Sequence, residues 1–217
     1  ITGNPRYDLI VTMKNKSKKE KLAIYNKLGL NSRKGIVVIA TQWYAGVASC
    51  YTPEANEAFI WKTLEDMKEF PEKQVVVKLH PAYHREYKEI TREIINELQI
   101  NNVVVTERFL WELLSICNLL ITKSSTVGLE AMLFDKPVIT FNPTGTPGLN
   151  PYAGTDAVIK VYKEEGLVPA IKDALYNKVV RRKLAEARNR FVYEYAYLQD
   201  SKASQRVANL IEQMIEE

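Results

Sequence analysis

The sequence lacks the features that mark several large classes of protein. No apolar run approaches the roughly 20 residues that a membrane-spanning helix needs. The opening, ITGNPRYDLIV, has neither a starting Met nor the basic-then-apolar pattern of a signal peptide. We therefore expect a soluble, cytoplasmic chain that is cut from a longer protein.

Cysteine and histidine are scarce. The two cysteines, Cys50 and Cys117, are far apart in the sequence, as is typical of buried thiols in a reducing compartment. The two histidines, His80 and His84, have no Glu and no third ligand at the spacing of a known metal site. Neither a series of zinc ligands nor an aromatic RNP motif is present. We expect no bound metal and no nucleic-acid partner.

Charge of either sign is moderate. The chain has 30 basic and 26 acidic residues, which gives a net charge of +4. The densest basic run is Lys14–Lys21, and such runs usually form solvated helix ends. Peripheral contact with an anionic membrane, or with an acceptor that carries phosphate, is the alternative for this segment.

Short apolar runs rich in β-branched residues dominate the first two-thirds of the chain. They are mostly continuous rather than alternating, which is typical of strands covered on both faces. The predicted strands are 36–40, 75–79, 103–105, 119–122, 137–141 and a weaker 157–161.

Helical patterns separate these runs. Thr52 suits the N-cap and Pro53 the first turn of the first helix in this series. The predicted helices are 52–70, 86–98, 110–117 and 127–134, and after residue 162 they are 164–176, 180–195 and 201–216. The alternation predicts an α/β fold with a Rossmann-like, doubly wound parallel sheet of about six strands and extra C-terminal helices.

We expect a single domain over residues 1–217. A linker-like leading segment with a helix occupies 1–35, the alternating sheet 36–162 and the C-terminal helices 163–217. The long irregular stretch 142–156 is rich in proline and glycine. A loop of that length is usually functional or mobile.

Polar residues follow the predicted strands at the points where they end. In an open parallel sheet, ligands bind in the crevice beyond the carboxyl ends of the strands. The candidates are Thr41, Gln42 and Trp43, then His80 and Pro81, then Thr106, Glu107 and Arg108, and finally Lys123, Ser124, Ser125 and Thr126.

The segment 119–139 carries the strongest signal. A strand delivers the hydroxyls of Ser124, Ser125 and Thr126 to the start of a helix, where backbone N–H groups and the helix dipole favour a phosphate. Gly128 would allow a close approach of a ligand or of neighbouring backbone, and Glu130 could accept hydrogen bonds from a ribose diol. The alternative is that Ser125 or Thr126 only caps the helix.

His80 ends a buried strand before Pro81. Its imidazole could donate to a diphosphate oxygen or act as a catalytic acid or base. A lone histidine is more often structural, but its position at the crevice favours a functional role.

Several of these residues resemble a known superfamily. The relevant motifs are Thr2-Gly3-Asn4-Pro5 with Asp8, Lys78-Leu79-His80-Pro81, Ser124-Ser125-Thr126 with Glu130, and Lys136-Pro137-Val138-Ile139. Together they resemble the C-terminal domain of GT-B-fold enzymes. These include glycosyltransferases, poly(glycerol-phosphate) glycerophosphotransferases and UDP-N-acetylglucosamine 2-epimerases.

The resemblance implies roles for the candidate residues. His80, Ser124, Ser125 and Thr126 would hold phosphates, Glu130 would hold the ribose, and the loop 106–108 would receive the base. Two positions depart from the family pattern: Lys123 stands where many relatives have Asp, and Thr41-Gln42-Trp43 stands where epimerases have a basic motif.

The function implied is donor binding in a GT-B glycosyltransferase. A nucleotide-diphosphate sugar would be the substrate, no cofactor would be needed, and a missing N-terminal domain would hold the acceptor, so that this fragment is inactive alone. The alternatives are a glycerophosphotransferase-like enzyme that uses a CDP-polyol, an epimerase, and a non-catalytic nucleotide-binding module.

Overall fold

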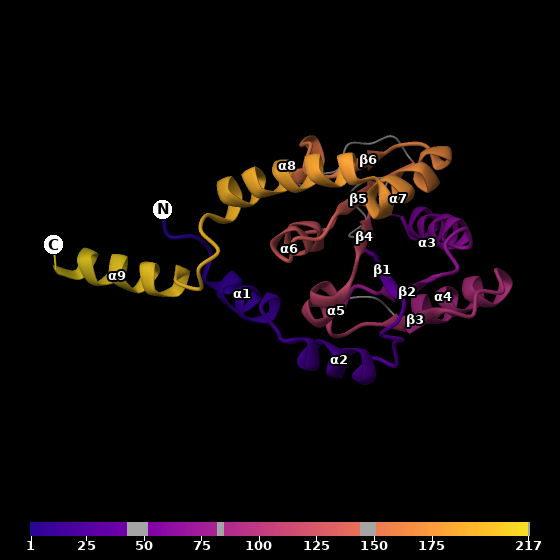
Figure 1. Ribbon diagram of the computed structural model, residues 1–217, viewed down its shortest axis with the longest axis horizontal. Helices are drawn as coiled ribbons and strands as arrows, with labels where there is room; N and C mark the ends of the chain where they lie inside the picture. Colours follow the sequence, from indigo (N-terminus) through magenta and orange to yellow (C-terminus); the bar gives the residue numbers. More distant parts are fainter. Residues whose placement is uncertain (43–51, 82–84, 144–150, 217) are drawn as a thin grey trace.

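A computed structural model describes residues 1–42, 52–81, 85–143 and 151–216 of the chain. Within these residues six strands form one parallel sheet in the order β3-β2-β1-β4-β5-β6 (Figure 1). The strands are β1 (Gly35–Ala40), β2 (Lys73–Lys78), β3 (Val103–Thr106), β4 (Leu119–Thr122), β5 (Val138–Phe141) and β6 (Ile159–Val161). The predicted doubly wound α/β fold is confirmed.

The strand order reverses between β1 and β4. Ala40, the last residue of β1, is level with Lys78 of β2 and with Thr122 of β4. The segments that follow these three strands therefore leave the sheet at the same edge. In doubly wound sheets this reversal opens the crevice in which ligands bind.

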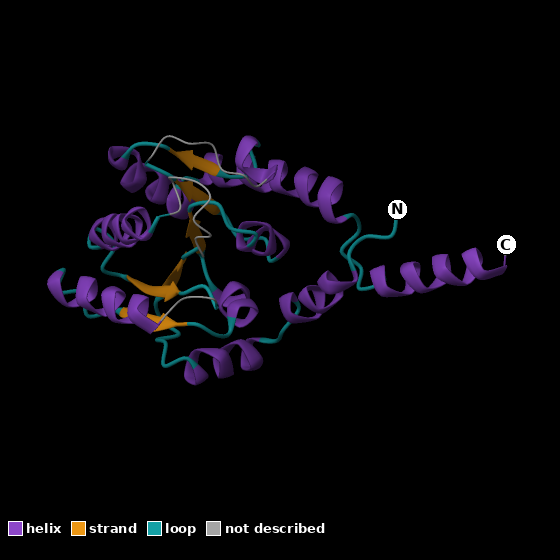
Figure 2. Cartoon of the chain, turned by 180° about the vertical axis from the view of Figure 1, so that it is seen from behind, coloured by secondary structure: helices purple, strands orange, loops and turns teal. Residues whose placement is uncertain are grey.

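Helices cover both faces of the sheet (Figures 1 and 2). Successive residues of β1 point to opposite faces, so that Val38 and Val37 belong to different buried clusters. The cluster with Val38 includes α1 (Asp8–Lys14), α2 (Lys18–Lys27), α5 (Leu110–Ile116), α6 (Val127–Leu133) and α8 (Lys178–Ala196). The cluster with Val37 includes α3 (Pro53–Met67), α4 (Arg85–Glu97) and α7 (Leu167–Tyr176).

The helices between strands lie within a few residues of the predicted bounds. Thr52 caps α3 as expected, since its hydroxyl accepts a hydrogen bond from the Ala55 N–H at 3.2 Å. Cys117 is buried at the end of α5, as predicted. Trp43, Cys50 and His84, and the part 144–150 of the irregular stretch, lie outside the described residues.

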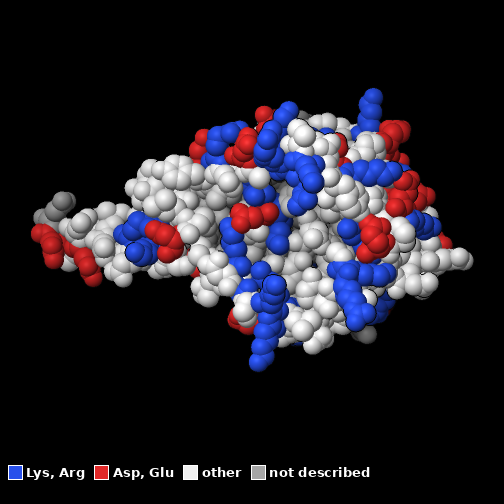
Figure 3. Space-filling model, in the orientation of Figure 1, with Lys and Arg blue, Asp and Glu red and all other residues white. Residues whose placement is uncertain are grey.

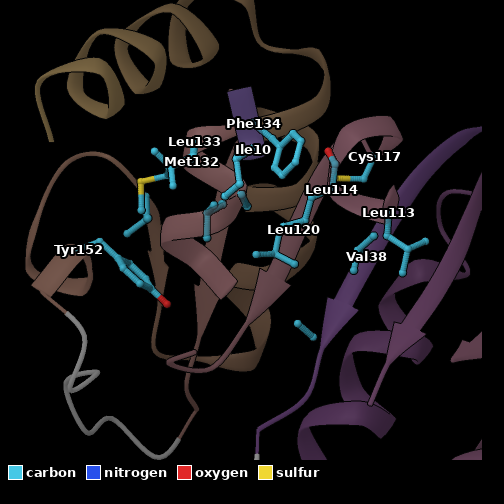
Figure 4. Packing of buried hydrophobic residues seen from close by; sticks show 14 of the residues in the cluster. Ile10, Val38, Leu113, Leu114, Cys117, Leu120, Met132, Leu133, Phe134 and Tyr152 are labelled. Atoms are coloured by element: carbon cyan, nitrogen blue, oxygen red, sulfur yellow. The ribbon is translucent and has the colours of Figure 1, made fainter. Parts of the chain in front are cut away.

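The first 35 residues are more ordered than the linker-like segment that the sequence indicated. A 3-10 turn η1 (Pro5–Tyr7) and two helices occupy them, instead of a single helix. Ile10 of α1 is fully buried in the cluster that contains Leu114 and Phe134 (Figure 4). Ile10 lies between Leu9 and Val11 in the sequence, and this short apolar run does not show which side chain is buried. The contacts of Ile10 fix the helix to the domain.

The basic run Lys14–Lys21 joins the end of α1 to the start of α2, as predicted for helix ends. Two of its lysines form ion pairs, Lys14 with Asp135 and Lys16 with Glu20. No helix among the described residues is long and apolar enough to cross a membrane.

The last helix, α9 (Ala203–Glu216), extends away from the sheet (Figures 1 and 2). Ala203 is its one buried residue. The large apolar side chains exposed along it are those of Leu210, Ile211, Met214 and Ile215. Figure 3 shows acidic side chains at the far end of this helix and a gathering of Lys and Arg side chains over the middle of the same face.

Candidate functional site

A cavity of ≈ 270 Å³ with mixed polar and apolar walls lies at the carboxyl ends of β1 and β2, beside the reversal in strand order. Helices α5 and α6 and the leading residues of the chain complete its wall. The lining residues are Arg6, Ala40, Thr41, Lys78, Leu79, His80, Pro81, Glu107, Phe109, Leu110, Ser125, Thr126, Val127 and Glu130.

Glu130 provides a buried carboxylate on this wall. Its side chain is 7% exposed, and its Oε1 accepts a hydrogen bond from Nη2 of Arg6 at 2.8 Å. Burial raises the pKa of Glu130, while the Arg6 charge, a hydrogen bond from Trp111 and the Lys78 charge act in the opposite direction. The wall therefore combines a carboxylate with cations that favour its ionised form.

Lys78 is the last residue of β2 and is also buried. Its Nζ donates to the carbonyl oxygen of Leu79 at 2.6 Å. Burial lowers the pKa of Lys78, and the charges of Glu107 and Glu130 oppose that effect. A buried ammonium beside an open cavity is well placed to attract an anion.

His80 lines the cavity at the end of β2, where the sequence placed it. Its backbone N–H donates to the hydroxyl of Thr41 at 3.1 Å, which joins the ends of β1 and β2. Burial and the Lys78 charge lower the pKa of His80 below its ordinary value of 6.5. This lowered pKa favours the neutral imidazole, in which one nitrogen can donate and the other accept.

The three predicted hydroxyls divide into two groups. Ser125 and Thr126 line the cavity, whereas Ser124 is not among its lining residues. The amide of Gln42 holds Ser124 by two hydrogen bonds, donating to its carbonyl oxygen and accepting from its N–H. Gln42 and Ser124 thus fix the loop that carries the other two hydroxyls.

The start of α6 differs from the sequence-based expectation of unpaired N–H groups. The Gly128 N–H donates to the Ser125 carbonyl oxygen at 2.9 Å, and the Leu129 N–H to that of Thr126 at 3.0 Å. A tight turn at the beginning of this short helix uses these donors. An anion here would depend mainly on the side chains of Ser125 and Thr126.

Gly128 makes a close approach possible, but to a side chain of the same protein. A Cβ at position 128 would lie 2.5 Å from Cζ and Oη of Tyr152, which belongs to the turn η3 (Pro151–Gly154). Tyr152 is buried, and its hydroxyl donates to the carbonyl oxygen of Ser125. Tyr152 therefore supports the cavity wall from behind.

The remaining candidates lie at the rim or outside the cavity. Glu107 lines it and forms an ion pair with Lys88 at 3.2 Å. The Thr106 hydroxyl accepts from the Arg108 N–H at 3.1 Å, so that these two residues shape the loop without lining the cavity. Lys123 is buried and donates to the Ala55 carbonyl oxygen of α3 at 3.1 Å.

Three residues of the site were not predicted from the sequence as site residues: Arg6, Lys78 and Trp111. Arg6 is 124 positions from the carboxylate that it contacts. Arg6 lies beside the motif Thr2-Gly3-Asn4-Pro5, and Lys78 begins the motif Lys78-Leu79-His80-Pro81. These positions are the sequence feature by which both residues could have been found. The contact of Arg6 with Glu130 depends on how the leading segment crosses the domain, and local pattern does not encode that path.

The arrangement suits a ligand that has both anionic groups and neighbouring hydroxyls. Arg6 and Lys78 bring positive charge to the cavity, and Ser125, Thr126 and His80 offer hydrogen bonds to an anion. Glu130 can accept two hydroxyl hydrogen bonds, because a carboxylate has about four acceptor sites.

The fold is the Rossmann-like domain found in GT-B enzymes, as the resemblance predicted. The family described as CDP-glycerol:poly(glycerophosphate) glycerophosphotransferase matches residues 1–213. The chain belongs to this family.

Solved structures agree on the fold. The wall teichoic acid polymerase TagF is 19% identical with a TM-score of 0.68, and the match covers 100% of this chain and 52% of TagF. The UDP-GlcNAc 2-epimerase of Neisseria meningitidis, bound to UDP-GlcNAc, is 18% identical with a TM-score of 0.69, and the match covers 100% and 55%.

A protein of Listeria monocytogenes, provisionally assigned as a UDP-N-acetylglucosamine 2-epimerase, is 16% identical with a TM-score of 0.66. The match covers 99% of this chain and 53% of that protein. At these identities the likeness shows the fold alone. The chain spans about half the length of these structures. No curated protein matches the sequence.

Proposed function

We propose that this chain is the nucleotide-binding half of a transferase that moves a polyol phosphate, with CDP-glycerol or a similar CDP-polyol as donor. The family match over residues 1–213 carries the choice of a cytidine donor. The cavity beside the strand reversal supports nucleotide binding, because it offers cations, hydroxyls and a buried carboxylate together.

In the proposed complex, the ribose hydroxyls donate to Glu130. The diphosphate lies against Ser125, Thr126 and His80, with Lys78 behind them. The base occupies the side of the cavity formed by the loop before α5. A volume of ≈ 270 Å³ is near the lower end of ligand sites, which run from roughly 300 Å³ upward. The cavity would therefore hold part of the donor, and contacts made elsewhere would hold the rest.

The remaining contacts would come from another part of the same protein. The chain spans about half of the related structures, and α9 presents exposed apolar side chains that such a part could cover. That part would hold the acceptor, so we expect this chain to bind nucleotide and to be inactive alone. The reaction requires no cofactor, because the nucleotide is a substrate.

The reaction transfers a phosphoryl-linked polyol. An acceptor hydroxyl gives its proton to a base or to water, and its oxygen attacks the phosphorus of the polyol phosphate. The bond from that phosphorus to the bridging oxygen breaks, and CMP leaves with the electron pair. Negative charge grows on the CMP phosphate as this happens. We propose that His80 donates a hydrogen bond to that phosphate and that Lys78 stabilises its charge.

A nucleotide-sugar donor for glycosyl transfer is the second candidate. The epimerase bound to UDP-GlcNAc has the same fold, and a carboxylate for ribose with cations for phosphate suits any nucleoside diphosphate. An epimerase reaction itself is less well supported, since the Thr41 hydroxyl that replaces a basic group is used to hold the His80 backbone. A non-catalytic module would bind nucleotide without turnover even in the full-length protein.

Calorimetric titration with CMP, CDP, UDP and GDP separates these possibilities. We expect a cytidine nucleotide to bind most tightly. Glu130→Gln should weaken its binding by about 1–3 kcal/mol, because a charge-assisted hydrogen bond to the ribose is lost. The exposed Glu93→Gln on α4 is the matched control and should leave the affinity unchanged.

Each outcome has a clear meaning. Tighter binding of UDP or GDP than of a cytidine nucleotide, weakened by Glu130→Gln, would favour the glycosyl donor. Equal affinity of wild type and Glu130→Gln for every nucleotide would refute the assigned site.

A further inference from the structure

Arg6 approaches the cavity from the leading segment, defined here as residues Thr2–Asp8. Its guanidinium donates to Glu130 at 2.8 Å, yet the Arg6 side chain is 66% exposed and that of Glu130 only 7%. An exposed partner of this kind adds little to folding stability, because solvent screens it. Its main effect falls on the buried carboxylate.

Arg6 and Trp111 both lie beside that carboxylate. Arg6 donates a hydrogen bond to it, Trp111 lowers its pKa, and the Arg6 guanidinium lies 5.9 Å from the centre of the Trp111 ring. These contacts come from two elements, the leading segment and α5. They fix the direction of the carboxylate and leave acceptor sites for hydroxyls in the cavity.

The leading segment is itself held at both ends by the beginning of α9. Nε of Arg206 donates to the Thr2 carbonyl oxygen at 2.7 Å. The Asp8 carboxylate accepts from the backbone N–H groups of Ala203 at 3.1 Å and Ser204 at 2.9 Å. Arg6 therefore reaches Glu130 from a backbone that does not depend on the ligand for its position.

Only a few charged groups act on the pKa of Glu130. Arg6 and Lys78 are the cations whose charges lower its pKa, whereas burial raises it. Tyr7 faces it from the leading segment, and burial raises the pKa of the Tyr7 hydroxyl, as does the Glu130 charge. The other titratable groups on the cavity wall are His80 and Glu107.

We propose that Arg6 is a positioning residue for ribose recognition: it keeps the Glu130 carboxylate oriented and ready to accept hydroxyl hydrogen bonds. This inference rests on the proposed nucleotide function. It assigns Arg6 no contact with phosphate, so its effect depends on the ribose hydroxyls. Loss of Arg6 should weaken binding of a ribonucleotide and leave binding of the corresponding deoxyribonucleotide unchanged.

The first test uses CDP and 2′,3′-dideoxy-CDP with the wild type, Arg6→Gln and Arg6→Lys. Arg6→Gln should lower the affinity for CDP by about twofold to fivefold, the range for a single exposed ion pair. The affinity for dideoxy-CDP should stay the same, and Arg6→Lys should recover part of the loss. Arg33→Gln, an exposed substitution away from the cavity, is the control. An equal loss for both nucleotides would assign Arg6 to phosphate binding and overturn the proposal.

The second test needs no ligand. The carboxyl carbon of Glu130 is titrated by NMR in the wild type and in Arg6→Gln. We expect the pKa of Glu130 to rise in Arg6→Gln, because a cation beside the carboxylate is lost, and to return towards the wild-type value in Arg6→Lys. An unchanged titration would overturn the proposal even if the protein binds CDP.

The two tests separate the proposals. If the wild type binds no nucleotide, the proposed function fails, while the NMR titration still decides whether Arg6 controls Glu130. If the wild type binds CDP but Arg6→Gln changes neither the titration nor the ratio of the two affinities, only the role of Arg6 is refuted.

Discussion

Substitution of Gly128 by alanine tests how the cavity wall is supported. A Cβ at this position would lie 2.5 Å from Cζ and Oη and 2.9 Å from Cε2 of Tyr152. Real Cβ atoms do not approach other atoms so closely, so the ring must move. Tyr152 is 1% exposed and packed in the core, and its hydroxyl is bonded to the Ser125 carbonyl oxygen.

The expected cost follows from three contributions. Forcing a side chain out of a packed core costs roughly 1–3 kcal/mol, and loss of the hydrogen bond to Ser125 costs about 1 kcal/mol. The higher helix propensity of alanine returns up to about 1 kcal/mol. We therefore expect Gly128→Ala to lower the free energy of unfolding by about 1–3 kcal/mol.

Urea denaturation measures this difference. Gly154→Ala is the matched control, because a Cβ there has no atom within 4 Å, and its stability should stay within about 0.5 kcal/mol of the wild type. In a Tyr152→Leu background, which removes the ring atoms that the new Cβ would meet, Gly128→Ala should cost much less. If Gly128→Ala is as stable as the wild type, or costs the same in both backgrounds, the steric argument is wrong.

Three further predictions concern individual side chains. Burial raises the pKa of Cys117 to about 11. In a Cys50→Ser variant, the Cys117 thiol should therefore react with a disulfide reagent at pH 8 only after denaturant unfolds the protein. Rapid reaction in the native state would contradict its burial. Burial alone would raise the pKa of Asp8, but hydrogen bonds from Ser204 and Ala203 lower it below 3.8. The ionised Asp8 carboxylate therefore stabilises the fold above pH 3.8, and this stabilisation is lost as the pH falls through the folded-state pKa. Asp8→Asn should remove that acid dependence in thermal denaturation. Burial and the Lys78 charge lower the pKa of His80, so protonation of its ring destabilises the folded state. The stability that the neutral ring provides is fully present above pH 6.5 and is lost as the pH falls through the folded-state pKa. NMR titration of the ring protons should give a midpoint below pH 6.5.

The family match changes which of the two donor hypotheses, a nucleotide sugar or a CDP-polyol, is better supported. The sequence motifs suggested a glycosyl donor first and a CDP-polyol second, and the match to the glycerophosphotransferase family favours the second. Both hypotheses require the same cavity. This is why the choice of base and of donor rests on titration with nucleotides, and why Glu130 alone cannot distinguish them.

Local pattern determined the framework of this protein. The continuous β-branched runs and the helical segments between them predicted a parallel sheet, because each kind of element buries its apolar residues with its own period. The same pattern placed His80, Ser125 and Thr126 at strand ends, since the crevice of such a sheet lies beyond the carboxyl ends of its strands.

The tertiary structure alone decided which polar groups face the cavity. Lys123 and Ser124 lie beside Ser125 in sequence but do not line the cavity: Lys123 donates to α3, and Gln42 holds the Ser124 backbone. Arg6 reaches Glu130 because α9 holds the leading segment in place. The sequence shows which residues are available, but contacts between distant segments arise from packing that no local period encodes.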